Sequence, residues 1–421
     1  MELSDHLFRH EAGRMVAALT RIFGIHNLAL AEDVVQDAFC RALEVWKFRG
    51  IPENPAAWLM ATAKNRALDA LRRERTARTL EPELSRLLQS EWTLAPAVEE
   101  LFTANAIKDD QLRMMFSCSA PRLPEEAQVA LILHILCGFS VDEIASAFVS
   151  THAAMEKRIT RAKKVLAASK ILFDIAAPED FLVRLPAVQR ALYLLFNEGY
   201  HGASPESTVR ADLCHEAMRL AAILREHPLG ARPTTYALSA LMCLGAARLP
   251  ARVNASGELN ALFDQDRSLW DQGLIAEGER LLDLSATGSE LTVYHVEAAI
   301  SWVHASARRT EDTDWCAIVR LYDSLMKIRP SPIVALNRAV AVAQSEGPDR
   351  GLDEIRAIEN SDRLSAYPFY SAALGELESR RGNFEVAREH FRTALALARN
   401  TMEQRFLEQR VSKCEGRSSV V

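Results

Sequence analysis

The chain has 421 residues, enough for about three domains of ordinary size, and Gly and Pro together make up under a tenth of it. This composition disfavours turn-rich β architectures, collagen-like repeats and long flexible linkers, while 49% apolar residues exclude wholesale disorder. The formal net charge of −6 at pH 7, taken as a total, argues against a nucleic-acid partner. Apolar residues at three- and four-residue spacing nearly throughout predict an all-α protein.

Nothing in the sequence predicts secretion or a membrane anchor. The N-terminus lacks the basic and apolar regions of a secretory signal, and the longest apolar stretch, residues 127–139, is too short to span a bilayer. The seven cysteines are an odd number without a C-x-x-C pair, so neither a disulfide framework nor a zinc ribbon is indicated. We therefore expect a cytoplasmic protein that does not enter a membrane and uses no metal or other cofactor.

Residues 1–78 are predicted to form a first helical unit. Its helix over residues 31–46 carries a polar face at three- and four-residue spacing, made of Asp33, Gln36, Asp37 and Arg41. Such a face can dock against another helix through ion pairs and amide hydrogen bonds. No His, Ser or Cys constellation accompanies the carboxylates, so we expect no catalytic residues and no enzyme activity.

The next helix, over residues 58–75, is basic. From Lys64 to Arg78 there are six basic and two acidic residues, a net charge of +4. Basic side chains beside an aromatic one suit a nucleic-acid strand whose bases are splayed, or a duplex backbone. The residues that we expect to serve this role are Trp58, Lys64, Asn65, Arg66, Arg72 and Arg73. The alternative is that Trp58 is a core anchor beneath a solvated helix.

A connector over residues 79–109, with two prolines and more acid than base, precedes a second helical unit at residues 110–176. Residues 138–166 have the pattern of a helix-turn-helix. Ser140 and Glu143 form a predicted capping box, and Thr151 is the expected N-cap of the second helix. The apolar stripe of that second helix, Met155, Ile159, Ala162 and Leu166, would face the first.

The opposite face of the second helix is basic, with five basic residues against Glu156. Side chains near the start of such a helix reach base edges in the major groove, and later Lys and Arg neutralise phosphates. The predicted DNA-contacting residues are Thr151, His152, Lys157, Arg158, Arg161, Lys163 and Lys164. A solvated basic face is the alternative.

Residues 177–421 are predicted to form a long helical region. In residues 368–400 the positions of Gly375, Gly382, Ala387 and Phe391 fit a tetratricopeptide unit, a 34-residue pair of antiparallel helices. An aromatic and a proline expected in that unit are missing, and the copy upstream is degenerate. An irregular helical bundle is the competing interpretation.

The motifs together resemble a known family. A-E-D-V-V-Q-D-A-F, N-P-A-A-W-L with K-N-R-A-L-D-A-L-R-R, and G-F-S-V-D-E-I-A with R-I-T-R-A-K-K-V-L look like regions 2 and 4 of bacterial sigma-70-type factors of the extracytoplasmic-function group. The likeness covers about residues 5–170, and the remainder resembles the subgroup with a tetratricopeptide-like C-terminal extension. The order of Glu156 and Lys157 departs from a common Lys-Ser order, so we expect an unusual promoter preference.

The resemblance implies two small sigma-type helical domains, joined by a linker and followed by a tetratricopeptide-like array. It implies that the Asp33/Gln36 face binds core RNA polymerase, whose partner subunits are β′ and β. It further implies that the Trp58 helix binds the −10 promoter element, and that the second helix of region 4 reads the −35 element. The C-terminal domain, residues 177–421, would regulate activity through an unidentified protein or peptide partner.

Two alternatives belong to other classes of protein. A stand-alone helix-turn-helix regulator with a helical-repeat sensing domain would bind an operator without polymerase. A helical-repeat scaffold would have no DNA role. The first leaves the motifs at residues 31–46 and 58–75 unexplained, and the second leaves both basic helices unexplained.

Overall fold

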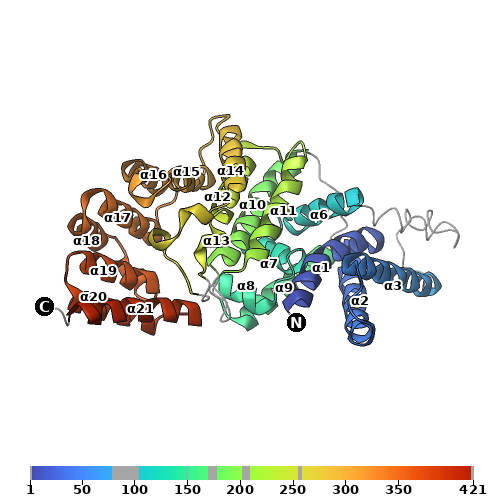
Figure 1. The fold of residues 1–421 in the computed structure, drawn as a ribbon. Helices are drawn as coiled ribbons and strands as arrows, with labels where there is room; N and C mark the ends of the chain where they lie inside the picture. Colours follow the sequence, from blue (N-terminus) through green and yellow to red (C-terminus); the bar gives the residue numbers. More distant parts are fainter. Residues whose placement is uncertain are drawn as a thin grey trace. The chain divides into compact units, whose positions relative to one another are not determined.

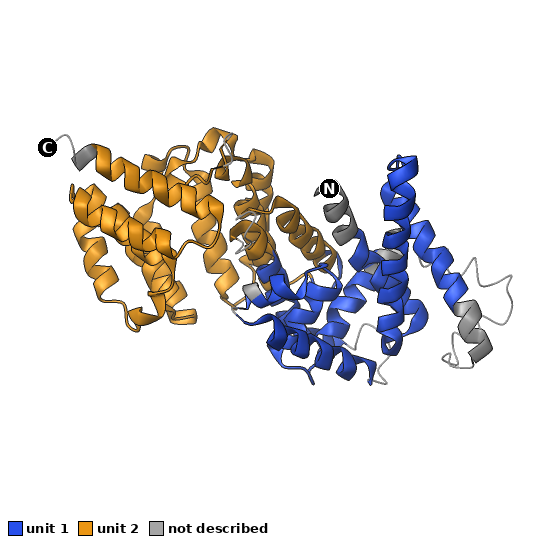
Figure 2. Ribbon diagram, turned by 90° about the horizontal axis from the view of Figure 1, so that it is seen from below, with its two compact units in different colours: residues 1–195, 226–230 blue, residues 196–225, 231–421 orange. Residues whose placement is uncertain are grey.

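The structure, a computed structural model, describes residues 2–77, 104–148, 150–168, 178–201, 209–254 and 258–418. Within these ranges the chain is all-α as predicted, and the one β feature is an isolated antiparallel bridge between Val253 and Leu259. The chain divides into two compact units, which Figure 2 colours separately. Unit 1 comprises residues 1–195 and 226–230, and unit 2 comprises residues 196–225 and 231–421. Most of the predicted connector, residues 78–103, lies outside the described residues.

Unit 1 is a helical cluster built around α1. Its elements are α1 (Glu2–Phe23), η1 (Ile25–Asn27), α2 (Leu28–Arg49), α3 (Pro55–Ala77), α6 (Ala104–Cys118), α7 (Glu125–Ile135), α8 (Val141–Ala147), α9 (His152–Ala167) and the first part of α10 (Pro178–His201). Helix α1 packs against α2, α3, α6 and α7. Met15 and Leu19 of α1 are fully buried, so this helix supplies the centre of the core.

Helix α2 has the periodicity expected of a helix that packs on one side. Its buried residues recur at three- and four-residue spacing, as listed here: Leu28, Ala31, Val34, Val35, Ala38, Ala42 and Trp46. The helix ends at Gly50, whose φ of 78° is one that glycine adopts without strain. The opposite side of α2 is left to solvent.

Unit 1 extends beyond the predicted boundary at residue 176. Helix α10 begins at Pro178, where proline suits the first turn of a helix. The ring of Phe181 stacks on that of Phe116 with centroids 3.8 Å apart. Arg184 donates a 3.2 Å hydrogen bond to the carbonyl oxygen of Phe116. The start of α10 therefore covers α6 and belongs to the same compact unit.

Unit 2 is a succession of neighbouring helices (Figure 1). After the end of α10 come α11 (Ala211–Glu226), α12 (Pro233–Ala246), α13 (Leu249–Arg252), η2 (Leu262–Asp264), η3 (Arg267–Leu269), α14 (Gln272–Ser285), α15 (Val293–Ser306), η4 (Thr310–Asp312), α16 (Trp315–Ile328), α17 (Pro332–Glu346), α18 (Pro348–Arg356), η5 (Ser361–Leu364), α19 (Pro368–Arg380), α20 (Phe384–Ala396) and α21 (Thr401–Ser418). Helix α12 packs on α14 and α15, and α16 to α18 pack in sequence. Helix α20 contacts both α19 and α21.

The segment with tetratricopeptide spacing forms a helix pair, α19 and α20. Gly375 lies against the Phe391 ring, and a Cβ at this glycine would meet ring carbons at 3.0 Å. Ala387 and Phe391 are buried between the helices. The glycine therefore permits the close approach that the spacing predicted, whereas membership of the tetratricopeptide class stays a prediction.

Candidate polymerase and nucleic-acid interfaces

The predicted docking face lies on the solvent side of α2. Asp33, Gln36, Asp37 and Arg41 are all exposed. Arg41 donates to the carboxylate of Glu44 at 3.2 Å, an exposed pair that contributes less than about 1 kcal/mol. The structure therefore places the four predicted residues together on one accessible, mixed-charge face.

Exposed apolar side chains at the end of α2 were missed by the reasoning from sequence. Leu43, Phe48 and Ile51 expose 57%, 84% and 57% of their surface. Large apolar side chains that stay in water together are typical of interaction sites. Spacing gave no signal for Leu43, because it lies three residues before the buried Trp46 and so fits the pattern of the stripe that α2 buries. We call these three residues the apolar end of α2.

Helix α3 begins with a side-chain cap and carries the predicted −10 residues. The Asn54 side-chain oxygen accepts a 3.0 Å hydrogen bond from the Ala57 amide. Trp58 is half-buried, and its ring meets the buried Trp46 ring edge-on with centroids 5.5 Å apart. The tryptophan thus anchors α3 on α2 and also keeps an accessible surface, so both predicted roles fit its position.

The polar residues of α3 differ in how far they reach solvent. Asn65 is exposed, while Lys64 and Arg66 are half-buried. Arg72 and Arg73 lie on the same helix, and their side chains are outside the described part. Ala63, Ala67 and Leu68 form the buried stripe on the other side, so the basic residues are held by a packed helix.

Residues 138–166 form the predicted helix-turn-helix, α8 and α9. The Ser140 amide donates to Glu143 Oε2 at 2.8 Å, and the Glu143 amide donates to Ser140 Oγ at 3.2 Å. This is the reciprocal capping box expected from the sequence. Thr151 Oγ1 accepts a 3.3 Å hydrogen bond from the Ala154 amide, which makes Thr151 the N-cap of α9. The capping box thus fixes the start of α8, and Thr151 fixes the start of α9.

Helix α9 is amphipathic in the expected sense. Its buried residues are the predicted stripe: Met155, Ile159, Ala162 and Leu166. The residues predicted to contact DNA that are exposed are Thr151, His152, Lys157, Arg161 and Lys164. Arg158 and Lys163 are half-buried instead. The structure therefore brings most, but not all, of the basic face into solvent.

Three of the predicted DNA-contacting side chains are already held by carboxylates. Arg158 lies 3.0 Å from Glu126 Oε2, and His152 Nδ1 lies 2.6 Å from Asp142 Oδ1. Lys163 Nζ lies 2.6 Å from Glu32 Oε1 of α2. The pair between Lys163 and Glu32 connects the helix-turn-helix to the N-terminal helices within unit 1. Binding of a nucleic acid by these three side chains competes with their present partners.

A close backbone contact joins the same two parts of unit 1. At Gly13 of α1, an added Cβ would lie 2.0 Å from the carbonyl oxygen of Leu136, just after α7. Helix α9 also contacts η1, the short turn before α2. The N-terminal helices and the helix-turn-helix are therefore packed on each other in this structure.

Burial controls the titratable groups beneath this contact. It raises the pKa of the Cys118 thiol to about 12, with nearby Lys163 opposing the shift and Glu32 adding to it. Burial, followed by the charge of Lys163, lowers the pKa of His134, whose Nδ1 lies 3.0 Å from the Phe139 carbonyl oxygen. Both groups are consequently neutral at pH 7.

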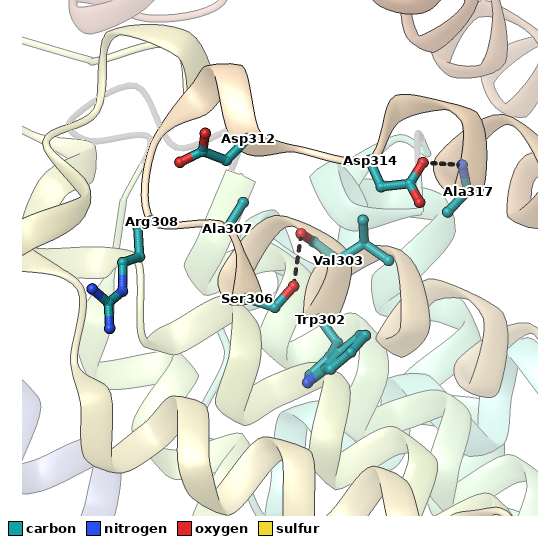
Figure 3. Close-up of a pocket in the computed structure, with 8 residues that line it drawn as sticks. All are labelled: Trp302, Val303, Ser306, Ala307, Arg308, Asp312, Asp314 and Ala317. Atoms are coloured by element: carbon teal, nitrogen blue, oxygen red, sulfur yellow. Dashed lines mark hydrogen bonds between the residues drawn. The ribbon is translucent and has the colours of Figure 1, made fainter.

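Unit 2 contains a pocket of about 400 Å³ between the end of α15 and the start of α16 (Figure 3). Its charged lining residues are Arg308, Asp312 and Asp314. Asp314 accepts a 2.8 Å hydrogen bond from the Ala317 amide as the N-cap of α16, and Asp312 pairs with Arg309. Both carboxylates of the pocket therefore already have partners close by in the chain.

The described residues contain no group of three or more His, Cys, Asp or Glu side chains arranged to hold a metal ion. None of the helices in the described ranges combines the length and apolar character that crossing a membrane requires.

Comparison with known proteins gives three family matches along the chain. Residues 7–77 match sigma-70 region 2, residues 113–166 match sigma-70 region 4, and residues 184–286 match a family of unknown function (DUF6596). The chain is also 41% identical over 399 residues to an uncharacterised protein of Rhizobium meliloti (strain 1021), covering 94% of this chain and 92% of that protein. The first two matched ranges contain every residue predicted to contact polymerase or promoter DNA.

Proposed function

Because the chain belongs to the sigma-70 family and carries its regions 2 and 4 in order, we propose that it is a transcription initiation factor of the extracytoplasmic-function group. It binds core RNA polymerase and directs the enzyme to a small set of promoters, without covalent chemistry of its own. The observation that carries this proposal is the helix-turn-helix α8–α9, whose basic face follows a matched region 2 in the same chain. The total charge of −6 is compatible with it, since the basic residues are concentrated in two helices.

Helix α2 supplies the polymerase-binding surface in this proposal. Asp33, Gln36, Asp37 and Arg41 provide ion pairs and amide hydrogen bonds to the β′ subunit. The apolar end of α2 adds apolar surface that is removed from water on binding. Each Å² of this surface contributes about 25 cal/mol of favourable binding free energy. A surface that combines both is consistent with a specific protein interface, in which apolar anchors are ringed by polar contacts.

Helices α3 and α9 contact the promoter. Trp58 offers a partly accessible ring to an unstacked base of the −10 element, and the basic residues of α3 track the strand. Lys157, Arg161 and Lys164 are exposed on α9 and positioned for the −35 element. Contacts of this kind make affinity fall steeply as salt rises.

The packing within unit 1 gives the free factor a reason to bind promoters weakly. Lys163 cannot neutralise a phosphate while it pairs with Glu32, and the contact at Gly13 holds regions 2 and 4 together. A promoter presents its two elements apart, so both contacts have to be released. We infer that polymerase drives this opening by binding α2 and α9 more strongly in the separated arrangement.

The C-terminal helices act as a regulatory domain in this proposal. Successive helix pairs such as α19 and α20 are typical of arrays that bind proteins or peptides. The partner is an unidentified protein or peptide, and a tetratricopeptide-like architecture is the form that we propose for the array. Truncation after residue 176 is a poor test of its role, because Phe181 would no longer cover Phe116.

Run-off transcription with purified core polymerase tests the proposal directly. The protein should yield promoter-specific transcripts, and Lys157→Ala with Arg161→Ala should reduce them and flatten their salt dependence. Arg280→Ala, an exposed arginine of α14, serves as the matched control. Absence of a specific transcript from any candidate promoter would refute the proposal. Tight operator binding by the protein without polymerase would instead favour a stand-alone helix-turn-helix regulator.

A further inference from the structure

Unit 2 contains a row of three arginines that alternate with two aromatic rings. The guanidinium carbon of Arg252 lies 4.2 Å from the Tyr200 ring centroid, and that of Arg248 lies 5.9 Å from the same ring. The guanidinium carbon of Arg248 is also 5.4 Å from the Trp270 ring centroid, and that of Arg267 is 5.0 Å from the same centroid. The row therefore runs Arg252, Tyr200, Arg248, Trp270 and Arg267. Cation–π contacts at these distances stabilise each neighbouring pair.

The arginine at one end of the row, Arg267, is bound by the protein through both of its terminal nitrogens. Arg267 Nη1 donates 2.8 Å hydrogen bonds to the carbonyl oxygens of His304 and Ala307, and its Nη2 donates to Thr313 Oγ1 at 3.1 Å. The charges of Glu311 and Asp312 also act on it. Arg267 thus caps carbonyl groups at the C-terminus of α15, which is a structural role.

The other two arginines are held much more loosely. In the described residues, the hydrogen bonds of Arg248 and Arg252 are one weak contact each, to Gln265 Oε1 and to His201 Nδ1, both at 3.4 Å. Neither guanidinium forms an ion pair within the part of the chain that the structure describes. Arg252 is only 7% exposed, and no residue in the described ranges forms a hydrogen bond with its Nε. Most of the five N–H donors on each of these two guanidinium groups are therefore unused. This is unexpected, because a buried charge without a partner is energetically costly.

The pKa values of two neighbouring histidines are lowered in part by the positive charge of the arginines. Desolvation and then the charges of Arg252, Arg248 and Arg399 hold the pKa of His201 well below its ordinary value. Burial, followed by Arg248 and Arg267, lowers the pKa of His304 to about 3. The Tyr200 hydroxyl and the Trp270 Nε1 are buried, and neither has a hydrogen-bond partner among the described residues. An oxyanion bound by Arg248 and Arg252 would offset this positive charge.

The row reaches the surface at Arg248, which is only half-buried. We propose that Arg248, Arg252 and Tyr200 form a binding site for the phosphate or carboxylate group of a small anionic ligand. Planar guanidinium groups bind such oxyanions through paired, charge-assisted hydrogen bonds. The rings of Tyr200 and Trp270 hold the two guanidinium groups in position. This site lies in unit 2 and is independent of the proposed role in transcription.

A purely structural row of cations and rings is the competing explanation. It predicts that substitutions alter stability but that the protein has no saturable anion site. The two explanations differ in what the protein does when an oxyanion is added at fixed ionic strength. Pyrophosphate and citrate are suitable probes, because one offers phosphate groups and the other carboxylates.

The test is isothermal titration of the full-length protein with each probe, with sodium chloride balancing the ionic strength. We expect saturable binding of at least one probe, and the probe that binds identifies the group recognised. Arg248→Gln should weaken binding by about tenfold or more, the loss of one charge-assisted contact. Arg248 is the better target, because it is half-buried and its substitution is compatible with folding, whereas Arg252→Gln endangers the core.

Two control variants make the result specific. Arg280→Gln removes an exposed arginine of the same unit, and Arg161→Gln removes one from the basic face of α9. Both should bind the probe as the unaltered protein does, and circular dichroism checks the fold of each variant. Absence of saturable binding of either probe would overturn the proposal. Binding that survives Arg248→Gln unchanged, or that Arg161→Gln abolishes, would overturn it as well.

Discussion

Replacing Gly13 by alanine perturbs one contact between regions 2 and 4 and leaves the rest of each region intact. The new Cβ would sit 2.0 Å from the Leu136 carbonyl oxygen, 2.7 Å from its carbonyl carbon and 2.9 Å from its Cα. The obstacle is backbone, so no side-chain rotation can relieve it, and α1 and the end of α7 must move apart by more than an ångström. Overpacking of this kind costs about 1–3 kcal/mol.

That cost should appear as local opening of unit 1. Amide hydrogen exchange in α1 and α7 should accelerate by roughly 5- to 150-fold if exchange proceeds through separation of the two helices, since 1.4 kcal/mol is a factor of ten. Mass spectrometry of peptides from the two helices measures this. Gly416→Ala is the matched control, because no atom of the described residues lies within 4 Å of its new Cβ. Unchanged exchange in the Gly13 variant would refute the packing of regions 2 and 4 as described.

Three further predictions concern single side chains. Glu32→Gln frees Lys163 and should raise the affinity of the free protein for a promoter duplex by about threefold at low salt. Glu44→Gln, which breaks the exposed pair with Arg41 on the same helix, should leave this affinity unchanged. Equal affinities of the two variants in fluorescence anisotropy titrations would contradict the prediction. Thr151→Ala removes the N-cap of α9 and should lower stability by about 1 kcal/mol in urea unfolding, so an unaltered transition would contradict the cap. Burial and neighbouring arginines depress the pKa of His304 to about 3, so the unfolded chain binds its proton first and stability falls as pH drops from about 6.5 towards 3. Between pH 7 and pH 5 this group should cost about 2 kcal/mol, a loss that His304→Phe removes from urea titrations, and an identical pH dependence in both proteins would show that His304 is not the cause.

Local patterns predicted the parts of this fold because they depend on short-range physics. The stripe of α9 and its Thr151 cap involve residues three and four positions apart, which share a helix face whatever the rest of the chain does. The capping box of Ser140 and Glu143 likewise joins residues only three positions apart. The all-α class needed no more than this periodicity.

Other features could not be read from spacing. The apolar end of α2 is visible only once the buried side of the helix is known, since an apolar residue gives no sign by itself of the direction in which it points. The extension of unit 1 past residue 176 depends on the stacking of Phe181 on Phe116, residues far apart in the chain. Both are consequences of packing between elements.

The sequence by itself determined the helices, their caps and the two basic segments within an acidic chain, because these depend on neighbours along one helix. Tertiary structure alone decided which charges stay available. It paired Lys163 with Glu32 across 131 positions, and it gathered Arg248 and Arg252 around Tyr200 without a carboxylate partner in the described residues. Charge counts along a sequence ignore such pairings, whereas a charge's effect depends on its distance to other charges and on its burial.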